Sequence, residues 1–476
     1  MMRIATAASC CAVLLAGCTV GPDFTRPDPP AVATYTPGTP PAAPGMPALV
    51  VTRDIPAEWW AVFRSPALDA LVRRALDGNP SLAEAKARLT QAQELRTARA
   101  GAVTWPRIDA TAGAERQRID PATFGFPQAP NPGPFNVFSL GANVSYDFDL
   151  AGGHRRELEA LAAEVDYAAY ELDAARLTLA SNVVATAIRR AALAAQIDAT
   201  ARIAEAQRRQ LAIVEARYRD GGVALVDVHG QRALAAQTEA TLAPMRAAWA
   251  QAGHELAILL GEAPATADLP APTLADLALP AELPLRLPSE LAEKRPDVRA
   301  SEALLRKASA NVGVATADLY PKLVISGGFS TTQLNVGDLF GNGINLWNFG
   351  ANLLQPVFRG GELQARKRAA EAAYEQAAAA YRGAVLTALR NVADVLRSIE
   401  EDARAVAART EQAKEAEAAR RIAQARYDLG GVSELAVLDA ERQRLAAEND
   451  RLQALANQLA DAAALFQALG GGWATP

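Results

Sequence analysis

The sequence predicts a mainly α-helical protein with a few β-strands, built from two copies of one structural unit. Three observations favour this fold class. Half of the 476 residues are hydrophobic but only 6% are aromatic, and Ala dominates long stretches, a composition typical of long helices. Residues 154–218 contain neither Gly nor Pro. A series of sequence landmarks recurs in the same order about 209–216 residues later.

The first residues form a targeting segment. Arg3 opens a short basic start, and the apolar run that follows ends in Leu15-Ala16-Gly17-Cys18, which resembles a bacterial lipobox. Signals of this kind are cleaved before the Cys, whose sulfur and new amino group are then acylated. We therefore expect a signal peptide at 1–17 and lipidation of Cys18, at the head of a lipid-anchored N-terminal segment, 18–60. An ordinary secretory signal with a chance Cys is the alternative.

Five pairs of landmarks define the repeat. They are Asn79-Pro80 with Arg295-Pro296, Trp105-Pro106 with Tyr320-Pro321, Gly141-Ala142-Asn143 with Gly350-Ala351-Asn352, Gly152-Gly153 with Gly360-Gly361, and Gly221-Gly222-Val223 with Gly430-Gly431-Val432. We place the first structural repeat at 61–262 and the second at 296–470. A Pro-rich connector at 263–295 separates them, because its prolines break helix repeatedly. Residues 471–476 form a C-terminal tail.

Each repeat contains two segments whose residues alternate with a period of two. The four strands are expected at about 105–119, 135–149, 321–332 and 344–357. In the second of them, Phe138 and Leu140 alternate with Ser139 and Gly141. Small polar residues on one face and apolar ones on the other suit a strand with water inside and lipid outside. A half-buried sheet in an ordinary domain is the alternative.

The number of strands bears on the oligomeric state. Four strands per chain are too few to close a membrane β-barrel, for which the smallest known examples need about eight. Open sheet edges are not tolerated in lipid. A membrane barrel therefore requires two or more chains, and the strand pattern alone does not choose between two and three.

A very long helix follows each pair of strands, at about 153–219 and 362–428. At about 1.5 Å per residue, such a helix would span roughly 100 Å. An apolar residue recurs every seven positions at Leu158, Val165 and Leu172, which predicts a coiled-coil seam. A structural coiled-coil rod would explain these helices but not the paired strands.

Several function classes are excluded by composition and motifs. All three Cys lie in the first eighteen residues, and the three His are scattered, which argues against disulfides, thiol chemistry and a metal site. The net charge of −5 comes without a basic block, so no nucleic-acid partner is expected. The chain carries no nucleophile elbow, P-loop or dinucleotide-binding motif. We expect no enzyme and no cofactor, apart from the covalent lipid on Cys18.

The landmarks resemble those of the outer-membrane factor family, the TolC-like proteins, and within it the NodT-type efflux lipoproteins of RND systems. The resemblance covers essentially the whole chain. Its residues are Cys18 to Phe24 with Arg26-Pro27, Trp59-Trp60, Phe63, Pro66-Ala67-Leu68, Leu71, Asn79-Pro80, Tyr146 to Leu150, Phe358 to Gly361, and Gly470 to Trp473.

The resemblance implies a lipid-anchored homotrimer in the outer membrane that extends into the periplasm. Three chains would share a twelve-stranded β-barrel, with four strands from each, and their coiled-coil helices would form a trimeric α-barrel. Such a duct passively exports small molecules, including drugs and toxic compounds. Its partners would be a periplasmic adaptor (membrane fusion protein) and an inner-membrane RND-type pump. A type I protein-secretion duct and a structural coiled-coil lipoprotein are the alternative functions.

Two Gly-Gly turns are the expected periplasmic tips, where the adaptor would bind. Gly suits the left-handed conformation at a helix end and lets another backbone approach. The adaptor-contact residues are Gly221, Gly222 and Val223 in the first turn, and Gly430, Gly431, Val432 and Ser433 in the second. Plain helix caps without a partner are the alternative.

A periplasmic gate is expected after the second tip. Leu435, Asp439 and Arg442 are spaced by four and three residues, which puts them on one helix face. They resemble the constriction residues of the family in a Leu-x-x-x-Asp-x-x-Arg pattern, although Glu441 replaces the usual Gln. In the first copy, Asp227 occupies the comparable stretch. An ion pair on a solvated helix is the alternative.

Overall fold

The computed structural model describes residues 19–37, 43–51, 55–270, 272–341 and 344–472. The chain folds into two compact units, and each draws on both halves of the sequence. The first, which we call the β unit, contains residues up to 26, 89–167 and 301–381. The second, the α unit, contains 27–88, 168–300 and the residues from 382 onwards. All sites described below lie within one unit or the other.

The same order of elements occurs twice along the chain. The first series is α3 (Pro80–Thr104), β2 (Arg107–Arg118), β3 (Pro134–Phe148), α4 (Gly153–Arg219) and α5 (Leu225–Leu259). The second series is α7 (Pro296–Ala317), β5 (Lys322–Gln333), β6 (Ile344–Leu354), α8 (Glu362–Asp428) and α9 (Glu434–Ala468). The last strand ends at Leu354, three residues before the expected 357, because Leu354 pairs with Lys322, the first residue of β5. Pro356 has no N–H with which to extend the ladder.

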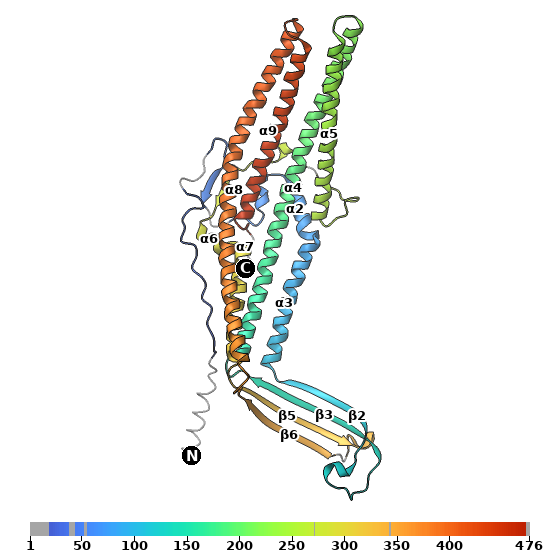
Figure 1. Cartoon of the computed structure of the whole chain (residues 1–476), viewed down its shortest axis with the longest axis vertical. Helices are drawn as coiled ribbons and strands as arrows, with labels where there is room; N and C mark the ends of the chain where they lie inside the picture. The colour runs from blue at the N-terminus through green and yellow to red at the C-terminus, as the bar shows by residue number, and fades with distance from the viewer. Residues whose placement is uncertain (1–18, 38–42, 52–54, 271, 342–343, 473–476) are drawn as a thin grey trace. The chain divides into compact units, whose positions relative to one another are not determined.

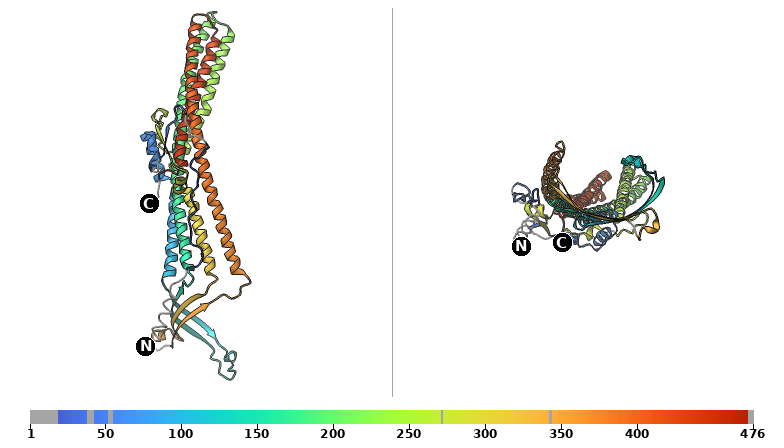
Figure 2. Two further views of the ribbon diagram at one scale, coloured as in Figure 1. Left: turned by 90° about the vertical axis from the view of Figure 1, so that its left-hand side faces the viewer. Right: turned by 90° about the horizontal axis from the view of Figure 1, so that it is seen from below.

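One antiparallel sheet belongs to the β unit, with the strand order β2-β3-β5-β6. Figure 1 and Figure 2 show its strands side by side in a curved sheet. Cross-strand neighbours include Tyr146 with Ile325 and Phe329 with Trp347. The outermost strands, β2 and β6, each pair with one neighbour only among the described strands. On β6, the side chains of the alternating residues Trp347 and Phe349 are 78% and 75% exposed.

Aromatic residues form part of the buried core of the α unit. Trp59 lies in a short 3-10 turn and stacks on Phe466 of α9, with 5.2 Å between the ring centroids. Helix α2 (Pro66–Gly78) follows, and the Ser65 hydroxyl caps it by accepting from the Leu68 N–H. The remaining 3-10 turns of the described chain are Pro121–Phe124, Leu274–Asp276 and Val336–Asp338.

The connector packs with the N-terminal segment and the end of α9. Strands β1 (Ala48–Val51) and β4 (Glu282–Leu285) form a parallel pair, and α6 (Pro288–Lys294) follows. The buried Arg286 and Arg295 donate to the carbonyls of Leu469 and Ala468. Cations are favourable at a helix C-terminus, where carbonyls lack partners inside the helix, so these contacts stabilise the C-terminal end of α9.

Across the described parts of the chain, no helix is both long and apolar enough to cross a lipid bilayer.

Candidate functional site

In the α unit, α4 and α5 form a first helical hairpin, and α8 and α9 form a second (Figure 1). Both hairpins turn through the same motif. At the end of α4, the Gly222 N–H donates to the Arg217 carbonyl at 2.8 Å, and Gly221 is left-handed with a φ of 77°. At the end of α8, Gly431 donates to Arg426 at 2.7 Å, and Gly430 has a φ of 72°. This is the Schellman arrangement, which satisfies the last helix carbonyls and favours Gly in the left-handed position.

The turns expose apolar side chains to solvent. Leu429, directly before the second Gly-Gly pair, is 87% exposed, and Val226 on the first turn of α5 is 71% exposed. Gly221, Gly222, Gly430, Gly431 and Ser433 are exposed as well, while Val223 and Val432 are half-buried. Open glycines next to exposed apolar side chains suit a surface on which another protein docks.

Asp227 has a local role at the start of α5. Its Oδ2 accepts a hydrogen bond from the Ala224 N–H at 3.1 Å, which satisfies a backbone donor of the first helical turn. Gly221 and Gly430 are 209 residues apart, and the same offset from Asp439 and Arg442 leads to Gly230 and Ala233. The first hairpin therefore carries no ion pair at the positions that correspond to Asp439 and Arg442.

Leu435, Asp439 and Arg442 lie on α9 and are all exposed. Arg442 Nη2 is 3.2 Å from Asp439 Oδ1, and both side chains are more than half exposed. An exposed pair of this kind contributes only about 0–1 kcal/mol to stability. The pair therefore adds little to the fold, and its charges remain available at the surface.

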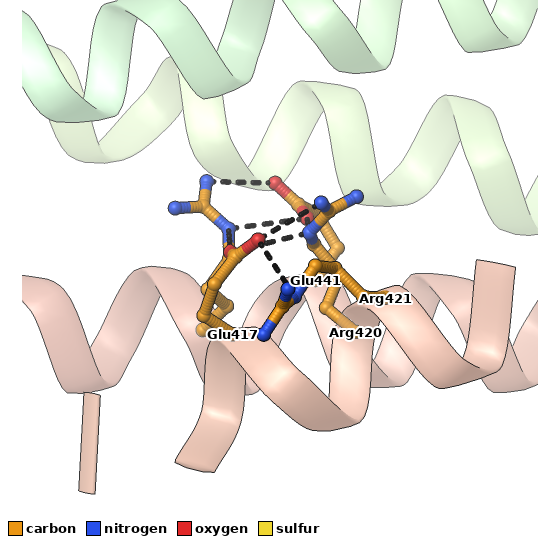
Figure 3. A network of polar contacts seen from close by, with 5 residues as sticks. Glu417, Arg420, Arg421 and Glu441 are labelled. Carbon is orange, nitrogen blue, oxygen red and sulfur yellow. Dashed lines mark hydrogen bonds and ion pairs between the residues drawn. The ribbon is translucent and has the colours of Figure 1, made fainter. Parts of the chain in front are cut away.

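A second ionic cluster joins α8 to α9 next to this face (Figure 3). Arg420 contacts Glu417 at 3.0 Å and Glu441 at 3.7 Å. Arg444 contacts the same two carboxylates, Glu441 at 3.0 Å and Glu417 at 3.5 Å. The hydrogen bond from Arg420 holds the pKa of Glu417 below its usual value. Each carboxylate thus contacts arginines of both helices, which ties the hairpin together.

A polar chain links the first hairpin to the second. Arg217 of α4 donates to the Tyr427 hydroxyl at 2.5 Å, and that hydroxyl donates to Glu434 Oε2 at 3.0 Å. Glu434 is buried at 4% exposure, and its other oxygen accepts from Gln210 at 2.8 Å. Burial, together with the Glu434 carboxylate, raises the pKa of Tyr427. The two hairpins are therefore joined next to their tips.

A polar cavity of about 340 Å³ lies beside this link, between α4, α5, α8 and α9. Gln207 and Gln231 line it and are almost fully buried. Gln231 donates to the Gln207 carbonyl at 3.0 Å, whereas the Gln207 side-chain amide and Gln231 Oε1 have no protein partner. A polar void of this size can hold water, which would pair these atoms. The hairpins are thus less tightly packed here than a dry core would be.

The sequence predicted the two turns between helices and placed Asp439 and Arg442 on one helix face, but it did not predict the link between the hairpins. An Arg-Tyr pair precedes each Gly-Gly turn in the sequence, as Arg217-Tyr218 and as Arg426-Tyr427. The contact, however, crosses the repeats, from Arg217 of one copy to Tyr427 of the other, and matching along a sequence does not reveal such a crossing.

Cys18, the expected lipid site, lies outside the described residues. Among the described residues, no three His, Cys, Asp or Glu side chains group as metal ligands would.

Comparison with known proteins places the chain in a recognised context. The family model "Outer membrane efflux protein" matches residues 71–262 and 287–471. The pyoverdine export outer membrane protein OpmQ of Pseudomonas aeruginosa is 32% identical over 423 residues, with 87% of each chain covered. Nodulation protein T of Rhizobium leguminosarum bv. viciae is 27% identical over 474 residues, covering 99% of this chain and 94% of that protein.

The fold has close counterparts among solved structures. The outer-membrane channel OprN superposes with a TM-score of 0.82 at 29% identity, with 96% of this chain and 100% of that chain covered. Long helices combined with a small sheet are therefore shared along nearly the whole length of both chains.

Proposed function

The chain belongs to the outer membrane efflux protein family, and on that premise we propose that three copies assemble into one export duct. As a member of this family, the chain is an outer-membrane channel component of an efflux system and not an enzyme. The oligomer, its gate and its partners are our inference. The observation that carries the oligomer is the sheet of the β unit, which has two outer strands without a second partner in the described chain.

The edges of the sheet support a shared barrel. Strands in lipid must pair on both sides, because an unpaired backbone group in hydrocarbon costs several kcal/mol. In a ring of chains, β2 of one protomer would pair with β6 of the next, and three protomers would supply twelve strands. The exposed Trp347 and Phe349 on alternating positions of β6 suit an outer face in contact with lipid. The long helices of three chains would then form the trimeric α-barrel.

The hairpin ends of the α unit would form the periplasmic gate. In a threefold assembly, the face of Leu435, Asp439 and Arg442 would occur three times around the axis. Each Asp439 is paired with Arg442 of its own chain, which relieves the repulsion between three nearby carboxylates. Because the pair is exposed and weak, and because polar contacts join the hairpins beside it, a modest force at the tips would open the duct.

A periplasmic adaptor would supply that force at the Gly-Gly turns. Their exposed glycines and the exposed Leu429 and Val226 offer a backbone and apolar surface for a partner helix. An inner-membrane RND-type pump would drive the export, and a lipid on Cys18 would anchor each chain in the outer membrane. OpmQ is described as exporting pyoverdine, and we infer small-molecule cargo for this chain too, including toxic compounds.

A deletion strain tests this function. We expect loss of the gene to sensitise cells to several drugs, solvents or detergents and to raise the intracellular level of a fluorescent efflux substrate. Expression of the intact chain should restore both. Unchanged sensitivity, together with the loss of a secreted protein from the medium, would instead identify a protein-secretion duct.

A further inference from the structure

The first described residues of the chain are held against the turn between β3 and α4, inside the β unit. The Val20 N–H donates to the Ala151 carbonyl at 3.0 Å. Arg155 Nη1 donates to the Thr19 hydroxyl at 2.7 Å. A segment that needed only to span a distance would not require such contacts. Further contacts hold residues 19–23, which we call the N-terminal strap.

Arg156 is the centre of this contact. Its side chain is only 5% exposed, although Arg is rarely buried unless it is paired. It donates to the carbonyls of Val20 and Gly21 at 3.2 and 3.3 Å, and to Asp23 Oδ1 at 2.7 Å. The fourth acceptor, Glu159 at 2.9 Å, lies on its own helix. Three of the four acceptors therefore belong to the strap, and a buried guanidinium would lose them if the strap left.

Glycines bring three backbones together at the same place. A Cβ on Gly21 would lie 2.5 Å from Gly313 Cα, and a Cβ on Gly152 would lie 2.7 Å from Thr19 Cα. Both residues also have a positive φ, of 92° and 78°. A Cβ on Gly313 would lie 2.7 Å from Arg156 Cγ. Only Gly allows this approach and these conformations without strain, so the geometry is specific to a docked strap.

We propose that Gly152, Arg156 and Gly313 form a cradle that binds the strap and thereby fixes the point at which the lipid on Cys18 enters the membrane. This proposal rests on the proposed lipidation of Cys18. Consecutive Cα atoms are about 3.8 Å apart. Docking of Thr19 therefore limits how far the acylated residue before it can move. A lipid on the residue before Thr19 would therefore be attached near the turn that leads out of β3.

This arrangement has a physical consequence for insertion into the membrane. Acyl chains contribute about 0.8 kcal/mol per buried CH₂. On a short, fixed connection, the lipid and the sheet act as two linked membrane contacts, and linking raises the effective concentration of the second contact. If the strap were undocked and flexible, the same lipid would retain the protein at the membrane without aligning the sheet. Arg156 is thus a positioning residue, since it acts on the lipid only through the strap.

Thiol reactivity tests the docking. The mature chain has no Cys except the acylated Cys18, so Val20→Cys introduces a single free thiol. In purified full-length protein, we expect a maleimide to react about tenfold faster when the strap is released by Arg156→Ala. Gly21→Ala changes only the strap and should have the same effect if Arg156→Ala impairs folding. Arg202→Ala, at an exposed ion pair of α4, is the matched control and should leave the rate unchanged. Equal rates in all four proteins would overturn the docking.

A double-mutant comparison separates positioning from simple packing. Arg156→Ala should lower the fraction of heat-sensitive oligomer in outer membranes when Cys18 is lipidated, although fatty-acid labelling stays normal. In a Cys18→Ser protein exported by a non-lipoprotein signal, Arg156→Ala should cause no further loss. An equal loss in both backgrounds would show that Arg156 merely supports packing and would contradict the proposal. If the unchanged chain is not labelled by fatty acid, Cys18 is not lipidated. The thiol rates report only on docking of the strap, so they distinguish a failure of the docking from a failure of lipidation.

Discussion

Arg217 and Tyr427 belong to the Arg-Tyr pairs that precede the two Gly-Gly turns, one in each repeat, and they contact each other across the repeats. The Arg217 guanidinium donates to the Tyr427 hydroxyl at 2.5 Å and lies 5.4 Å from the centre of its ring. Tyr427 in turn donates to the buried Glu434. The second copy thus differs in role from the first, because its tyrosine connects the two hairpins.

Removal of the Tyr427 hydroxyl should loosen the tips. Tyr427→Phe keeps the ring but takes away the bond from Arg217 and the bond to Glu434, which leaves a buried carboxylate with one partner fewer. We expect a loss of about 1–3 kcal/mol of local stability, measured as faster amide exchange in α8 and α9 close to the turn. Tyr218→Phe, at the matching position of the first copy, is the control and should exchange as the unchanged chain does. Equal amide exchange rates in the two variants would show that the Tyr427 hydroxyl does not stabilise the ends of the hairpins.

Two carboxyl groups predict a pH dependence in the α unit. Burial, followed by the charge of Asp402, raises the pKa of Asp461 to about 6 from a usual value of 3.8. Ser398, the remaining neighbour that affects it, donates a hydrogen bond that lowers the pKa. The folded state then holds a proton that the unfolded state releases, so the stability contributed by the protonated group is present below about pH 4 and is lost as the pH rises to about 6.

Asp461→Asn removes this titration. We expect the variant to have a higher melting temperature than the unchanged chain at pH 7.5, where a charged Asp461 is costly. The difference should become small at pH 4.5, where the carboxyl is neutral in the folded protein. Thermal unfolding followed by circular dichroism at both pH values measures this. A difference that is the same at both pH values would contradict a raised pKa.

Lipidation has a direct chemical test. Cys18→Ser should abolish labelling by a radioactive fatty acid, because acylation requires the sulfur and follows cleavage at this residue. We expect partial efflux to remain, since a barrel would still hold the protein in the membrane. Label that persists in the variant would mean that another residue carries the lipid.

The Gly-Gly turns should be neighbours of the adaptor. Cysteines at Val223 or Ser433 should form cross-links to the adaptor in cells, because both residues lie in the turns between helices. Cysteines at Phe124 or Phe340, exposed in the loops of the sheet, are the controls and should not. Cross-links to the adaptor from the loops alone would reverse the proposed orientation.

The secondary structure was largely readable from the sequence because the periodic signals are long. The absence of Gly and Pro between His154 and Tyr218 corresponds to one continuous helix, α4. The strand pattern of Phe138, Leu140 and Ala142 falls within β3. Such signals are local, since they depend on residues a few positions apart.

Contacts between distant residues were not readable. Arg156 appears in the sequence as one of many helix charges, and only the fold brings it to the carbonyls of Val20 and Gly21. Glu434 likewise appears as an ordinary residue of the first helical turn, yet it is buried and bonded to Gln210 of another helix. A sequence pattern gives the face of an element, whereas the partner of that face depends on the packing of the whole unit.

The proposed gate at α9 should control how fast ions pass through the channel. Single-channel conductance in planar bilayers should be compared between the unchanged protein and a variant with Asp439→Ala and Arg442→Ala. An exposed pair contributes only about 0–1 kcal/mol, so oligomer yield and melting temperature should be unaffected. Asp198→Ala with Arg202→Ala removes an exposed pair of the same kind from α4 and is the matched control. We predict a higher conductance for the first variant alone, accompanied in cells by sensitivity to vancomycin. Conductance and sensitivity equal to those of the unchanged protein, at normal oligomer levels, would contradict a gated export duct with its constriction at α9.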